Sequence, residues 1–127
     1  DIALLGAKAF SDTVIRAVSQ KTTYSAEIFG NKPRRIDLTT TVTILGEHGV
    51  LCGKTGTTSS AGSCLVLYSF ASGRPFVTVL LASNSEKGRY DDARSILIEL
   101  VRRIEHNKRP FDRMPEIKGD QARNAGR

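Results

Sequence analysis

The chain is poor in the residues that build a large core. Its 127 residues include no Trp, and only 39% are hydrophobic. A chain of this length can bury a modest core by itself, so at most one domain is expected. No apolar run is long enough to span a bilayer, so any membrane attachment would use segments that are not in this chain.

Potential metal ligands are equally scarce. His48 falls in a predicted turn, His106 falls at the end of a predicted helix, and only two cysteines are present, Cys52 and Cys64. Four ligands so far apart in the pattern predict no metal site, and nothing indicates a cofactor. The cysteines lie on neighbouring predicted strands, which leaves open whether they pair or stay free.

Acidic residues are outnumbered, which gives a formal net charge of +6. Such a balance would suit nucleic acid or an anionic surface. The basic residues are scattered, however: three lie within residues 32–35, two at 102–103, and six in residues 108–127. Scattered charge favours ordinary solvation and a basic tail, and no nucleic-acid partner is expected.

The first part of the chain predicts helix followed by a hairpin. Residues 2–19 have helical periodicity with a break near Phe10, after which Ser11 and Asp12 suit a helix N-cap. Residues 22–29 and 34–41 are rich in β-branched side chains and flank a Gly-Asn-Lys-Pro turn, which predicts two antiparallel strands.

Three stronger strands and a helix follow. Residues 50–57, 63–70 and 76–83 have short connections, which make them antiparallel neighbours. Apolar residues spaced by three and four then predict a helix that starts near Asp91 and lies across the sheet. The predicted class is α/β, of the α+β kind, with an antiparallel sheet and flanking helices.

The residues that indicate chemistry lie on the first of these three strands. They are Lys54, Thr55, Gly56 and Thr57, called here the tetrad. The strand period of two puts both threonine hydroxyls on one face. Gly56 weakens a strand unless another backbone comes close. Taken alone, the lysine would equally suit an exposed edge strand, and the threonines plain strand propensity.

With its surroundings, the tetrad resembles the C-terminal half of a serine-type D-alanyl-D-alanine carboxypeptidase. In that penicillin-binding family, which has a serine β-lactamase-like fold, Lys-Thr-Gly is the third active-site motif. The resemblance covers about residues 1–106, the expected catalytic portion, and is specific at residues 54–62 and around Arg89. Residues 107–127 are expected to be a polar basic linker or tail.

The resemblance implies a role for each site residue. Lys54 and Thr57 would be catalytic, with the backbone N–H of Thr57 in the oxyanion hole. The residues that bind the substrate would be Thr55, Gly56, Thr57 and Arg89. Arg89 would bind the terminal carboxylate of a peptide lying along the strand. The competing interpretation of Arg89 is a solvated arginine at a helix entrance.

The first two motifs of the family are missing. No serine is followed by lysine three residues on, or by asparagine two residues on. The chain also begins within a helical pattern and shows no signal peptide, so it is expected to be part of a longer, extracytoplasmic enzyme of the periplasm or cell envelope. The parent enzyme would act on peptidoglycan stem peptides and bind β-lactams, whereas this chain alone would be inactive. The alternative is a noncatalytic peptide- or glycan-binding module.

Two further features follow from the comparison with the family. Family members often carry an Asn-x-x-Leu-Leu-like segment before the tetrad, but this chain has Thr41 in place of the asparagine, which puts that contact in doubt. The strand at residues 76–82 is central in the family. Here it should therefore pair with the missing N-terminal half or with a second copy of the chain.

A nucleotide-binding loop is the remaining alternative for this segment. Gly53, Lys54 and Thr55 imitate the end of a P-loop. That motif needs a glycine where the chain has His48, and a helix where it has Gly56 and a turn. Nucleotide binding is therefore excluded.

Overall fold

The computed structural model describes residues 1–106, and the predicted tail at 107–127 lies outside them. The elements in chain order are α1 (Ile2–Ser11), α2 (Thr13–Ser19), β1 (Thr23–Ile28), β2 (Arg34–Thr39), the short 3₁₀ helix η1 (Glu47–Gly49), β3 (Val50–Thr58), β4 (Gly62–Ala71), β5 (Arg74–Ser83) and α3 (Glu86–His106). The predicted mixture of helices and antiparallel strands is confirmed.

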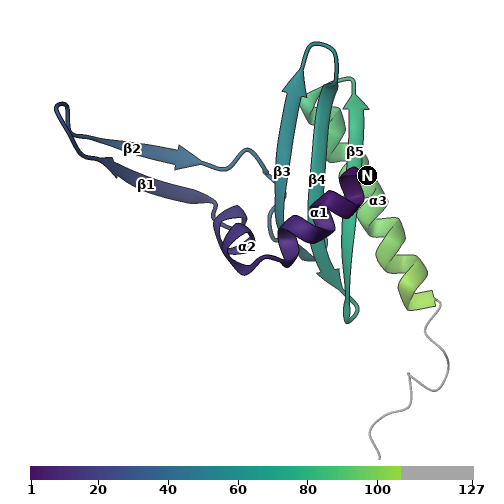
Figure 1. Ribbon diagram of the computed structural model, residues 1–127. Coiled ribbons are helices and arrows are strands. Elements are labelled where there is room, and N and C mark those ends of the chain that lie inside the picture. The colour runs from purple at the N-terminus through teal and green to yellow at the C-terminus, as the bar shows by residue number, and fades with distance from the viewer. Residues whose placement is uncertain (107–127) are drawn as a thin grey trace, which may run out of the picture.

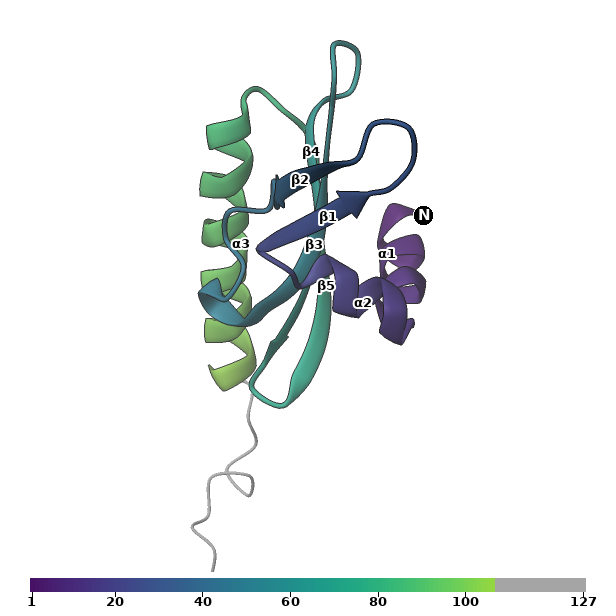
Figure 2. The ribbon, with the colours of Figure 1, turned by 90° about the vertical axis from the view of Figure 1, so that its left-hand side faces the viewer.

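The last three strands form an antiparallel sheet in the order β3-β4-β5. Seen from the side in Figure 2, α3 covers one face of this sheet, and α1 and α2 lie on the other. The main core lies under α3 and contains Val42, Ile44, Val50, Leu65, Leu67, Leu80, Tyr90, Ala93 and Leu97. The sheet edges at β3 and β5 have no strand neighbour among the described residues.

A glycine brings α1 close to the opposite face. A Cβ built on Gly6 would lie 2.8 Å from Cγ2 of Val66 and 3.3 Å from Cγ1 of Val77. Only a residue without a side chain lets the helix backbone approach β4 and β5 so closely. Val66 therefore marks the α1 face of the sheet.

The predicted break in the N-terminal helix is confirmed, and it falls at Asp12. The backbone of Asp12 is extended, and its carboxylate accepts hydrogen bonds from the backbone N–H groups of Val14 and Ile15. Two otherwise unpaired donors at the start of α2 are thereby satisfied, which ends α1 and begins α2.

The β1-β2 hairpin projects away from the rest of the chain (Figure 1). Its register pairs Tyr24 with Leu38 and Ala26 with Ile36, so these side chains share one apolar face. The side chains of Tyr24 and Leu38 are 52% and 51% exposed. The predicted hairpin is confirmed, but its apolar face is only partly covered.

The predicted start of the last helix near Asp91 is wrong, because α3 begins at Glu86. The Ser85 hydroxyl accepts a hydrogen bond from Gly88 N–H, and the Ser85 carbonyl accepts one from Arg89 N–H. Ser85 therefore caps an extra first turn, which the low helix propensity of Gly88 conceals in the sequence. The consequence is that Arg89 lies inside the helix.

Candidate active site

The tetrad lies on β3, at an edge of the sheet, and its side chains divide between the two faces. Lys54 is paired in register with Val66, and Thr55 with Leu65. Because Val66 faces α1 and Leu65 belongs to the core under α3, the lysine and the threonines are on opposite sides of the strand. The prediction that both threonine hydroxyls share one face is confirmed.

Lys54 is exposed and has no ion-pair partner within residues 1–106. Its ammonium donates to the carbonyl oxygen of Thr55 at 2.5 Å. Beside it a groove of about 670 Å³ runs between α2, the base of the hairpin and β3. Apolar side chains such as Val18, Tyr24 and Leu38 line this groove. A cation free of carboxylates is thus available to a ligand at the groove.

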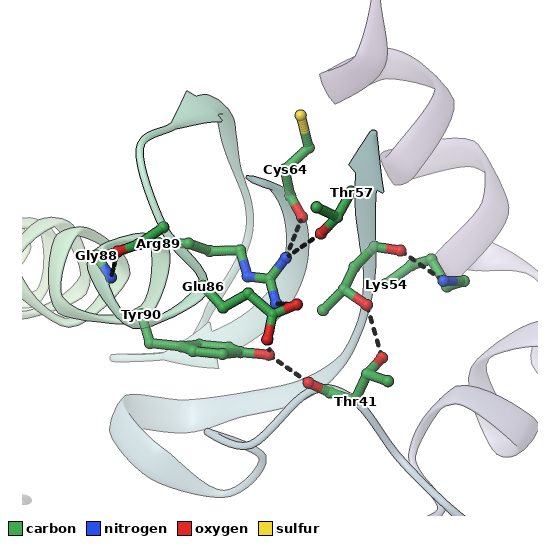
Figure 3. Close-up of polar contacts among 10 residues, drawn as sticks. Thr41, Lys54, Thr57, Cys64, Glu86, Gly88, Arg89 and Tyr90 are labelled. Carbon is green, nitrogen blue, oxygen red and sulfur yellow. Dashed lines mark hydrogen bonds and ion pairs between the residues drawn. The ribbon is translucent and has the colours of Figure 1, made fainter. Parts of the chain in front are cut away.

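Arg89 reaches the opposite side of the tetrad from the first turn of α3. Its guanidinium donates to the Thr57 hydroxyl at 3.2 Å and to the Cys64 carbonyl at 3.3 Å (Figure 3). The residue is only 2% exposed. The competing interpretation of Arg89 as a solvated arginine at a helix entrance is therefore wrong, since the longer helix turns this side chain toward β3 and β4.

The positive charge of Arg89 is incompletely compensated. Its nearest carboxylate, Glu86, lies 3.8 Å away on a side chain that is 74% exposed. The Tyr90 ring lies 4.9 Å from the guanidinium carbon, but the buried Nε of Arg89 has no hydrogen-bond partner. Within the described chain the buried charge of Arg89 is therefore only partly paired, which is energetically costly.

Thr41 and Tyr90 also contact the site, although neither is among the predicted site residues. The Thr41 hydroxyl lies 2.6 Å from the Thr55 hydroxyl, and the Tyr90 hydroxyl donates to the Thr41 carbonyl. Thr41 occupies the position where the family often has asparagine, so a side-chain contact to the tetrad exists here with a hydroxyl instead. That departure from the family pattern was the available signal for Thr41; for Tyr90 there was none.

Two glycines on β3 differ in what surrounds them. A Cβ on Gly53 would meet the Val66 carbonyl oxygen at 2.7 Å and Cδ2 of Leu67 at 2.8 Å. A Cβ on Gly56 would meet nothing within 4 Å. Packing within the described chain therefore explains Gly53 but not Gly56.

An ion pair fixes the loop that leads into β3. Arg94 on α3 donates to both carboxylate oxygens of Glu47, at 2.7 and 3.0 Å. These bonds lower the pKa of Glu47 from its ordinary value and raise that of Arg94. His48 lies in the same turn, as predicted, with a left-handed φ of 46°. The bidentate contact ties the start of β3 to the helix that carries Arg89.

The two cysteines are free and are not opposite each other. Cys52 is paired in register with Tyr68, whereas Cys64 is paired with Gly56. Burial raises the pKa of the Cys52 thiol, which keeps it protonated and unreactive. In this arrangement no disulfide joins the strands.

Residues 1–106 contain neither a metal-binding cluster nor a membrane-spanning helix. No group of three or more His, Cys, Asp or Glu side chains there could hold a metal ion. Among the helices of that same range, none is both long and apolar enough to cross a membrane.

Comparison with known proteins bears on the fold. No protein-family model matches the chain, and neither does any curated protein sequence. The Streptomyces K15 DD-transpeptidase structure matches with a TM-score of 0.72 and 23% identity, over 80% of this chain and 40% of that one. A variant of the same enzyme gives 0.71 and 25%, over 76% and 39%.

A second protein gives the same result. Penicillin-binding protein D2 from Listeria monocytogenes, in its cefotaxime-bound form, matches with a TM-score of 0.61 and 25% identity, over 77% of this chain and 38% of that one. The chain spans about two fifths of the length of these proteins. The expected transpeptidase-like and β-lactamase-like fold is confirmed for the part that the chain covers.

Proposed function

We propose that this chain, which adopts part of the penicillin-binding-protein and β-lactamase-like fold, is the C-terminal portion of a serine D-Ala-D-Ala carboxypeptidase. The parent enzyme acts on peptidoglycan stem peptides through an acyl-enzyme and is acylated by β-lactams. This chain supplies the Lys-Thr-Gly wall of its active site, and the serine nucleophile lies elsewhere in the parent. Such a substrate makes the enzyme extracytoplasmic, in the periplasm or cell envelope.

One observation carries this proposal: the tetrad lies on an edge strand, with the ammonium of Lys54 on one side and the buried, partly paired guanidinium of Arg89 on the other. Lys54 is free of carboxylates on one side of β3, and Arg89 contacts Thr57 on the other. Gly56 lies between them with no internal packing that requires a glycine. A substrate backbone running along β3 is the close neighbour that explains this glycine.

The roles of the individual residues follow from this arrangement. Lys54 polarises the neighbouring hydroxyls of the assembled site, and the Thr57 N–H stabilises the oxyanion, where one donor is worth ~3 kcal/mol in the transition state. Thr55, Gly56 and Thr57 hold the substrate backbone. Arg89 binds the terminal carboxylate of the peptide through its guanidinium.

Substitutions in the full-length parent test these roles. Lys54→Ala is expected to lower the acylation rate by about a hundredfold or more, whereas Arg89→Ala chiefly weakens substrates with a free terminal carboxylate. Lys87→Ala is the matched control, because Lys87 is exposed and, within residues 1–106, pairs only with Asp91. The measurement is the acylation rate with free-acid and amidated peptides. Equal losses on both substrates for Arg89→Ala would remove it from the carboxylate site.

A noncatalytic peptide- or glycan-binding module is the second candidate. It is favoured by the absence of both Ser-x-x-Lys and Ser-x-Asn from the sequence. For this chain alone we expect no hydrolysis of a D-Ala-D-Ala peptide and no covalent adduct with fluorescent penicillin on a denaturing gel. The parent should form the adduct. A parent that binds the peptide without ever being acylated would establish the second candidate instead.

The open edge of β5 gives the chain a structural partner. Residues 76–82 are almost wholly apolar and include Leu81, which is 62% exposed; among the described strands they lie beside β4 alone. The partner is the N-terminal half of the parent or a second copy of this chain. Light scattering of the chain should therefore show association that Leu81→Lys reduces. A stable wild-type monomer would contradict this pairing.

A further inference from the structure

Two hydrogen bonds place Thr41 between α3 and the tetrad. Its hydroxyl oxygen lies 2.6 Å from the hydroxyl oxygen of Thr55, and its carbonyl accepts a hydrogen bond from Tyr90 (Figure 3). Tyr90 is buried in the core, at 8% exposure, whereas Thr41 is itself exposed, on the segment between β2 and η1. A rigid residue therefore holds the Thr41 backbone while its side chain meets the tetrad.

We propose that Thr41 is a positioning residue that sets the direction in which the Thr55 hydroxyl donates. The inference rests on the function proposed above for the tetrad. Each hydroxyl has one proton, so in this pair one donates and the other accepts. Thr41 is the donor. Thr55 then keeps its own proton for the ligand.

The charge of the site supports this direction. Arg89 lies on the same side of β3 and suits an anionic ligand, such as the terminal carboxylate of a peptide. A carboxylate only accepts hydrogen bonds, so it needs Thr55 as a donor. Without the Thr41 hydroxyl, the Thr55 hydroxyl rotates freely and spends part of its time pointing away from the ligand.

The first experiment removes the Thr41 hydroxyl in the full-length parent while keeping the shape of the side chain. Thr41→Val is expected to lower the rate of acylation by a free-acid peptide about five- to tenfold, the size of one hydrogen bond, with KM little changed. Thr41→Ser restores the rate. Thr43→Val, an exposed hydroxyl two residues on with no side-chain hydrogen bond in the described chain, is the matched control.

A double-mutant cycle separates positioning from a general structural role. If Thr41 acts through Thr55, Thr41→Val causes no further loss in a Thr55→Val background. Slow acylation of that background can be followed over hours with fluorescent penicillin. An equal loss in both backgrounds, or a Thr41→Ser variant as slow as Thr41→Val, would overturn the proposal.

A third measurement does not depend on activity. In methyl spectra of the threonine-labelled full-length protein, the Thr55 methyl signal is expected to shift in Thr41→Val, but not in Thr41→Ser or Thr43→Val. A Thr55 signal unmoved in Thr41→Val refutes the contact even in an active enzyme. If penicillin never acylates the wild type, the proposed function fails, and the methyl signal still decides whether Thr41 orients Thr55.

Discussion

The apolar side chains between the sheet and α3 are buried, whereas several of those on the β1-β2 hairpin are exposed. Under α3, Ile44 and Leu67 are fully buried, and Leu97 is 1% exposed. On the hairpin, Tyr24 and Leu38 form a cross-strand pair that is about half exposed, and Phe29 at the turn is 83% exposed. A two-stranded ribbon cannot bury its own apolar face, whereas a sheet covered by a helix can.

This difference divides the proposed site into side chains held by contacts within the chain and side chains left exposed beside the groove. Arg89, Tyr90 and Thr57 are held by contacts within the sheet and α3. The hairpin instead borders the groove beside Lys54 with apolar side chains that are about half exposed. One half of the proposed site is therefore preorganised, and the other half is completed by whatever binds there.

The largest expected loss of stability comes from a truncation in the core. Leu67→Ala should lower the free energy of unfolding by about 3 kcal/mol, because it leaves a cavity under α3. Leu38→Ala should cost less than about 1 kcal/mol, since half of that side chain is already in water. Urea unfolding followed by circular dichroism suits a chain without Trp. Equal losses would mean that the hairpin is packed in solution.

The two glycines of β3 sharpen the comparison within one strand. Gly53→Ala should destabilise by about 2 kcal/mol, because its Cβ collides with the β4 backbone. Gly56→Ala should leave stability unchanged or raise it by about 0.5 kcal/mol. In the parent, however, Gly56→Ala should slow acylation of the peptide. Normal acylation of that variant would show that no backbone approaches there.

A smaller effect is the dependence of stability on pH that comes from the ion pair of Glu47 and Arg94. Hydrogen bonds from Arg94 lower the pKa of Glu47 below its ordinary 4.5. The ion pair therefore stabilises the fold above about pH 4.5, and this contribution is lost as the pH falls through the lower, folded-state pKa.

Glu47→Gln should accordingly lower the free energy of unfolding at pH 7 by less than about 1 kcal/mol, because the pair is partly exposed. Urea unfolding measures this difference. The difference from wild type should shrink toward pH 2. Glu27→Gln is the control, because no ion pair of Glu27 is found within residues 1–106, and it should leave stability unchanged at both pH 7 and pH 2. A constant difference for Glu47→Gln at all pH values would contradict the ion-pair explanation.

The smallest effect is at the hairpin turn. Phe29→Ser should change stability by no more than about 0.5 kcal/mol, because this side chain is almost wholly in water. It should nevertheless reduce any self-association that uses the hairpin, as measured by light scattering. A large loss of stability would show that Phe29 is buried against another molecule.

Local patterns in the sequence were sufficient for most elements. The helix break at Asp12, the hairpin and the three strands follow from caps, turns and periodicity, all of which act within a few residues. The sequence pattern does not predict the first turn of α3, because Gly88 has a low helix propensity. The contacts of Thr41 with Thr55 and of Tyr90 with Thr41 join segments 14 and 49 residues apart, which no local pattern encodes.

The order of strands in the sheet has a consequence for the folding pathway. Since β3, β4 and β5 follow one another through short turns, their pairings are local in sequence, and α3 comes directly after them. Local contacts close with little loss of chain entropy and form quickly. We therefore expect this meander and its helix to form an early nucleus, on which the hairpin and the flanking helices α1 and α2 condense afterwards.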